Sequence, residues 1–119
     1  MQTREFVEHV RKNFDKFVSA GTYYTFEDVR DVNNYIFRDE SLGLWILIQY
    51  VKKDHHGRKE KFVLRICNSS ERPEFFNSKD WTSIPDRFVK NLKHDFEEYF
   101  GFVSDPAMEI LKEIKYNEN

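Results

Sequence analysis

Apolar residues are densest in two runs that lie close together in the chain. LWILIQYV ends at Val51 and KFVLRIC ends at Cys67, and both are rich in the β-branched and aromatic residues that favour strands. The residues 54–57 between them, Asp-His-His-Gly, supply turn chemistry for a loop of four or five residues. The pattern predicts a β-hairpin, and therefore an antiparallel pair of strands.

The two predicted strands differ in the polarity of their faces. In the later strand the even-numbered residues from Phe62 to Ile66 share an apolar face, while the other face is mixed, so this strand is expected to be half buried. The earlier strand is apolar on both faces, and such a strand is normally covered on both sides. A second layer is therefore needed over Trp45, Leu47 and Val51, and either the chain itself or a partner supplies it.

Three other segments repeat apolar residues every three or four positions, which predicts helices. The first helix begins at Thr3 and is expected to stop at Gly21. The second runs from a capping-box start at Ser83 to Gly101, and the third covers residues 105–116.

The segment before the hairpin, residues 22–40, allows two interpretations. It fits a strand, a short helix over 26–32 and a short strand over 34–38, or else one long strand from Thr22 with a bulge. In both cases residues 39–43 form the turn into the hairpin. Together these elements predict a single α+β domain over residues 1–119, in the order α-β-β-β-α-α. Its antiparallel sheet of three or four strands packs with an N-terminal helix and two C-terminal helices.

Residues 68–83 form a long connection that carries three aromatic rings, Phe75, Phe76 and Trp81. Long connections in small domains are usually either functional or contain undetected structure. The three rings either fold back over Trp45 and Leu47 as the missing second layer, or stand at the surface as anchors for another macromolecule.

Composition narrows the class of protein. With 17% aromatic and 34% charged residues, the chain has the material for a packed core and a polar surface, as a soluble globular protein does. A single cysteine, Cys67, excludes an internal disulfide and fits a reducing compartment. The first residues carry charges throughout, unlike a secretory signal, and the apolar run 42–51 is too short to cross a bilayer. These features predict a cytoplasmic protein, and the many Lys, Asn and Phe with few Gly are typical of a low-GC bacterium or its phage.

Charge is concentrated at the tip of the predicted hairpin. The net charge of the chain is -2, but residues 52–65 hold six bases and only two acids. This basic patch either contacts phosphates of a nucleic acid or is an ordinary solvated hairpin tip. Its members are Lys52, Lys53, Arg58, Lys59, Lys61 and Arg65.

The predicted order of a helix, three strands and a helix over residues 3–100 resembles that of double-stranded RNA-binding domains. This resemblance implies that the second helix presents a basic N-terminus to phosphates. Here the corresponding segment reads Ser83-Ile84-Pro85-Asp86-Arg87, without a cluster of lysines.

The sequence contains few residues in patterns typical of catalysis or metal binding. Asp54, His55 and His56 suggest metal-assisted hydrolysis, but neighbouring side chains in an extended chain point apart. The sequence has no G-x-S-x-G, no H-E-x-x-H and no glycine-rich phosphate loop. We therefore expect no enzyme activity, metal or cofactor.

The leading hypothesis is a small inhibitor or adaptor that binds a larger macromolecule, or a second copy of itself, through the outer sheet face and the aromatic loop. Nucleic-acid binding by the basic patch is the alternative, and the hydrolase comes third. The residues predicted to bind the partner are Trp45, Leu47, Val51, Phe75, Phe76 and Trp81.

Overall fold

The computed structural model describes residues 1–24, 31–51, 61–74 and 79–100, and the structural statements that follow concern these residues. They form an α+β fold in which a five-stranded antiparallel sheet packs with two α-helices. In chain order the elements are α1 (Thr3–Lys12), the 3₁₀ helix η1 (Phe14–Lys16), β1 (Val18–Tyr24), β2 (Asp31–Asp39), β3 (Leu44–Val51), β4 (Lys61–Cys67), β5 (Thr82–Ser83), the 3₁₀ helix η2 (Asp86–Phe88) and α2 (Lys90–Phe100).

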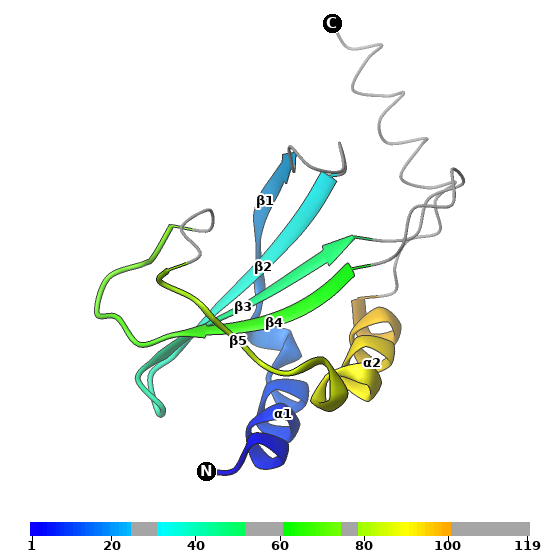
Figure 1. Ribbon diagram of the computed structural model, residues 1–119, viewed down its shortest axis with the longest axis horizontal. Coiled ribbons are helices and arrows are strands. Elements are labelled where there is room, and N and C mark those ends of the chain that lie inside the picture. The colour runs from blue at the N-terminus through cyan, green and yellow to red at the C-terminus, as the bar shows by residue number, and fades with distance from the viewer. Residues whose placement is uncertain (25–30, 52–60, 75–78, 101–119) are drawn as a thin grey trace, which may run out of the picture.

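The sheet is a meander in which each strand pairs with the next along the chain, in the order β1-β2-β3-β4-β5 (Figure 1). The predicted hairpin is confirmed as β3 and β4, with Ile48 opposite Leu64. The predicted count of three or four strands was too low, because β1, which contains the strand start predicted at Thr22, and the two-residue β5 both join the sheet. Since five strands separate the two helices, the likeness in element order to double-stranded RNA-binding domains does not hold.

The first helix is shorter than predicted. It ends at Lys12, where the side-chain amide of Asn13 donates to the carbonyl oxygen of His9 at 2.8 Å and meets one of the acceptors left at the helix end. The aromatic residues that followed the helical spacing lie instead in η1 and the turn after it. Gly21, expected to stop the helix, lies in β1 next to a bulge, with a φ of 105° that favours glycine.

The last described helix begins later than predicted. Ser83 belongs to β5, and the N–H of Ile84 continues the pairing by donating to the carbonyl oxygen of Leu64 at 2.8 Å. Pro85 has no N–H to continue the ladder, and the chain turns into η2 before α2 begins at Lys90. The predicted helix over 105–116 lies outside the described residues, as does most of the predicted short helix over 26–32, whose last two residues are in β2.

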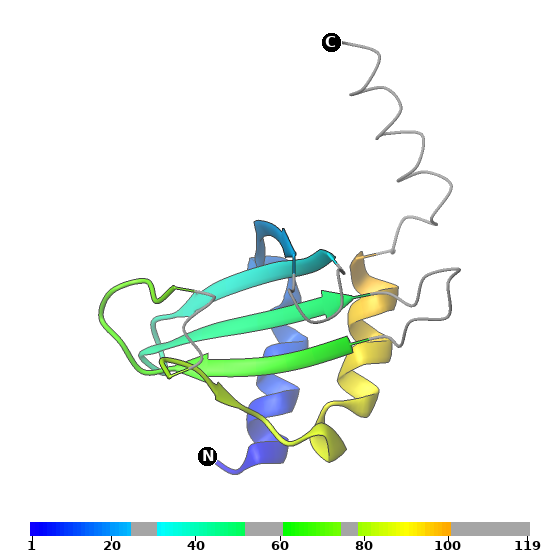
Figure 2. The same cartoon turned by 45° about the horizontal axis from the view of Figure 1, so that its top comes forward.

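Both helices lie side by side on one face of the sheet (Figure 2). The main core fills the space between them and the sheet, and Phe96 of α2 is fully buried at its centre. The ring of Phe96 lies 5.0 Å from that of Tyr35, 5.5 Å from that of Phe62 and 5.6 Å from that of Phe14, measured between centroids. One aromatic side chain therefore joins α2 to β2, β4 and η1.

Candidate functional surface

The face of the sheet turned away from the helices carries a second, smaller apolar cluster. Its buried members are Ile36, Leu47, Cys67 and Trp81, and Trp45 packs against them. Trp81 is only 6% exposed, and its indole N–H donates to the carbonyl oxygen of Glu74 at 2.9 Å. The chain thus supplies part of the second layer itself, from the segment just before β5.

The predicted partner-binding residues separate into three groups. Leu47, Val51 and Trp81 are buried. Trp45 is partly exposed, and Phe75 and Phe76 lie outside the described residues. Partner binding by this set stays a prediction, and Trp45 is the member with a described side chain that reaches solvent.

Two arginines flank Trp45 on the same face. Arg38 lies opposite it on β2, with the guanidinium carbon 5.4 Å from the centroid of the indole, and Arg65 lies diagonally across on β4. Arg38 is held in place because its Nη1 donates to the carbonyl oxygen of Ser69 at 3.1 Å. We call these three residues the Arg38–Trp45–Arg65 strip.

Two donors in this strip lack acceptors among the residues that the structure describes. The indole N–H of Trp45 and Nε of Arg65 are shielded from water, yet neither has a hydrogen-bond partner in the described part of the chain. Most buried polar groups in folded proteins are hydrogen-bonded, so such donors call for an explanation. Since neither atom is accessible, an acceptor oxygen of another molecule reaches them only if these side chains shift.

A polar pair lies further along this face. The buried Gln49 donates through Nε2 to Oδ1 of Asn34 at 3.1 Å, and Nδ2 of Asn34 donates to the carbonyl oxygens of Gly21 and Val32 at 3.2 and 3.3 Å. These amides are satisfied within the sheet, where they link β1, β2 and β3. Sequence alternation placed Gln49 on the apolar face but gave no sign of its partner.

Cys67 is buried in β4 and forms no disulfide. Burial, assisted by the negative charge of Asp80, raises the pKa of its thiol. The thiolate needed for nucleophilic chemistry is therefore disfavoured. The sequence interpretation of Cys67 as an ordinary strand residue agrees with this environment.

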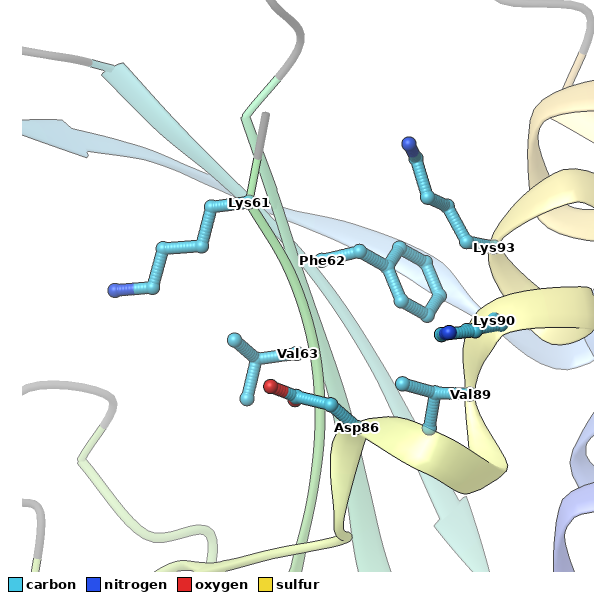
Figure 3. A pocket seen from close by; sticks show the side chains of 7 residues that line it. All are labelled: Lys61, Phe62, Val63, Asp86, Val89, Lys90 and Lys93. Atoms are coloured by element: carbon cyan, nitrogen blue, oxygen red, sulfur yellow. The ribbon is translucent and has the colours of Figure 1, made fainter. Parts of the chain in front are cut away.

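Only two members of the predicted basic patch, Lys61 and Arg65, lie among the described residues. Lys61 lines an open groove of about 350 Å³ between β4 and the start of α2, together with Lys90 and Lys93 (Figure 3). Sequence reasoning missed the last two lysines because it started the helix at Ser83, which put them mid-helix rather than in its first turn.

A buried carboxylate joins α1 to the turn between β2 and β3. Asp39 accepts hydrogen bonds from Nε2 of His9, from the hydroxyl of Ser41 at 2.6 Å and from the N–H of Leu42 at 3.1 Å. Burial alone raises the pKa of Asp39, but the hydrogen bonds from Ser41, His9 and Leu42 and the charge of His9 outweigh it, so the pKa lies below its usual value. Sequence reasoning assigned no role to His9, but Asp39, Ser41 and Gly43 form a turn signature that marked this site, and Gly43 adopts a left-handed conformation there.

Metal chemistry finds no support in the described segments. Asp54, His55 and His56 lie outside them, and within them no three His, Cys, Asp or Glu side chains gather as a metal site would require. No helix in the described ranges combines the length and apolar character needed to span a membrane.

Comparison of the chain with models of protein families, with curated proteins and with solved structures finds no match. Inference about function therefore depends on the surfaces described above.

Proposed function

We propose that this protein is a small, non-enzymatic interaction module, an inhibitor or adaptor that binds a larger cytoplasmic macromolecule through the helix-free face of its sheet. The observation that carries the proposal is the Arg38–Trp45–Arg65 strip, in which a partly exposed indole lies between two arginines. Phe75 and Phe76 remain part of the proposed surface.

The composition of the strip suits a protein interface. Trp and Arg are the residues most enriched among side chains that dominate binding energy. Leu47, Ile36 and Trp81 form a rigid, packed base beneath Trp45, so little side-chain freedom remains to be lost on binding. A carboxylate of the partner would complement the positive charges of Arg38 and Arg65.

Homodimerisation through this strip is a less favourable version of the proposal. A two-fold interface would bring Arg38 and Arg65 of one copy toward the same residues of the other, and like charges placed together in an interface are costly. A different protein with acidic side chains at the contact avoids that repulsion.

Partner capture from an extract, with the full chain as bait, tests the proposal. Trp45→Ala and Arg65→Ala are expected to abolish a specific captured band that wild type and Tyr99→Ala both retain. Tyr99 is the matched control, because it is a 54% exposed aromatic residue on α2, on the other side of the sheet. Unchanged capture by the folded Trp45 and Arg65 variants contradicts the proposal, and light scattering of the free protein distinguishes a dimer from a monomer.

Nucleic-acid binding is the second candidate, and the groove lined by Lys61, Lys90 and Lys93 is the observation in its favour. Phosphate contacts make affinity fall steeply with salt. An electrophoretic titration with mixed RNA and DNA is expected to show retention at low salt that disappears as salt rises. Absence of retention at low salt removes this candidate.

A further inference from the structure

The outer edge of the sheet is only partly closed by β5. The pairing of β5 with β4 covers Arg65 and Ile66, and the Ile84 N–H extends it to the carbonyl oxygen of Leu64. Pro85 then turns the chain away. Over residues 61–63, no strand in the described ranges pairs with this side of β4.

Backbone groups on a strand alternate in direction, so the N–H and C=O of Phe62 point to the same side as the carbonyl of Leu64. That side is the open one. At Phe62 the edge therefore presents a main-chain N–H and C=O of the kind that an extended segment of another protein uses to join a sheet.

The groove runs along this edge of β4. It has two walls, and a strand added at the edge would turn one face toward each of them. Figure 3 shows Lys61 and Val63 on one side of β4 and Phe62 on the other, directed toward α2. Lys90 and Lys93 line the helix side, while Asp86 reaches toward Val63. A strand laid along the edge would alternate its side chains between the Lys61 wall and the Lys90 wall.

The positive charge of the groove indicates what kind of segment binds there. Lys61, Lys90 and Lys93 outnumber the one acid of its lining, Asp86. Nζ of Lys93 also lies 3.7 Å from a carboxylate oxygen of Glu97, so the argument rests chiefly on Lys61 and Lys90. A second copy of β4 at this edge would bring a second set of lysines to a groove that is already basic, and lysines are among the residues that keep natural edges from self-pairing.

From this arrangement we propose that the open edge of β4 binds an extended acidic segment of a partner protein by strand addition, with its carboxylates toward Lys90 and Lys93 on the helix wall and its alternate, apolar side chains over Val63 and the methylenes of Lys61 on the other wall. A peptide fits better than a nucleic acid. Its main chain can pair with the edge, its apolar side chains can lie over Val63, and its carboxylates can all face the wall opposite Asp86, whereas a regular row of phosphates cannot.

This inference goes beyond the function proposed above and can fail separately from it. Lys61 and Cys67 are the two ends of β4, roughly 20 Å apart at the usual rise of a strand, and the row of Trp45 is at the Cys67 end. Trp45→Ala is therefore expected to leave binding in the groove unchanged.

The test uses the full chain and a fluorescein-labelled hexapeptide of alternating glutamate and valine, followed by fluorescence anisotropy. Saturable binding is expected, and Lys90→Glu is expected to weaken it about tenfold, as loss of a close charge pair does. Lys12→Glu is the matched control, because it makes the same charge change at an exposed position of α1 and should leave the affinity unchanged. Asp86→Asn is expected to strengthen binding.

A second peptide tests the main-chain hydrogen bonds separately from the charge. The same peptide with alternate backbone nitrogens methylated keeps its charge but cannot complete the ladder, and it is expected to lose most of the binding. Three outcomes overturn the inference: no binding of the unmethylated peptide, equal weakening by Lys90→Glu and Lys12→Glu, or equal affinity for the methylated probe. A thymidine oligonucleotide that binds more tightly than the peptide and responds to Lys90→Glu also overturns it, in favour of a nucleic-acid site.

Discussion

Asp39 shows how a single polar side chain can fix the position of a helix. It is buried at the end of β2, yet two side chains and one backbone N–H donate to it, and one of those donors, His9, comes from α1. A carboxylate can only accept, so Nε2 of His9 must carry the proton in this bond. The interaction therefore ties the helix to the turn before β3.

Asp39→Asn is expected to lower the free energy of unfolding at neutral pH by about 1–3 kcal/mol, the usual cost of disturbing a buried hydrogen-bonded charge. Because the pKa of Asp39 is lowered in the folded protein, its stabilisation is present above the unfolded pKa of about 3.9 and is lost as pH falls through the folded pKa. The difference between wild type and variant should therefore shrink toward acid pH in urea melts.

Asp15→Asn is the control for that series, since Asp15 is an exposed carboxylate of η1. It is expected to leave stability nearly unchanged across the same range. A loss for Asp39→Asn that is as large at acid pH as at neutral pH would contradict the assigned role.

At the scale of elements, α2 is held to the sheet by aromatic packing. Phe96 contacts rings from β2, β4 and η1, and it is completely buried. The periodicity of the chain predicted this helix and its apolar stripe correctly, although its start was wrong. The apolar repeat shows which residues of the helix face inward. It does not show where the helix starts, because the start depends on the pairing of Ile84 with Leu64 and on Pro85.

Phe96→Ala is expected to destabilise the protein by about 3–5 kcal/mol, because it removes the ring at the centre of the core and leaves a cavity. Phe96→Leu should cost less, since it fills more of the space. Tyr99→Ala, on the exposed side of the same helix, should cost far less than Phe96→Ala in denaturant unfolding. Equal losses for the Phe96 and Tyr99 alanine variants would mean that α2 does not pack as described.

At the scale of the molecule, the sheet has one face covered by two helices and another covered in part by a loop. The alternation of residues in β3 was enough to predict that a second layer covers Leu47 and Val51. Both side chains are buried. It left open whether Trp81 folds back over Leu47 or stands at the surface, because the loop between β4 and β5 has no repeat from which its path follows; the structure shows Trp81 folded back. The Arg38–Trp45–Arg65 strip was likewise hidden, since it combines neighbours from three strands whose register is fixed only by the folded sheet.

The central claim is that Trp81 covers part of this face and is itself buried, while Trp45 remains partly exposed at its surface, and the two tryptophans of the chain allow that claim to be tested directly. Acrylamide quenching of fluorescence is measured on Trp81→Phe, which reports Trp45, and on Trp45→Phe, which reports Trp81. The account predicts a clearly larger quenching constant for Trp45 than for Trp81. Equal constants, or a more accessible Trp81, would contradict it.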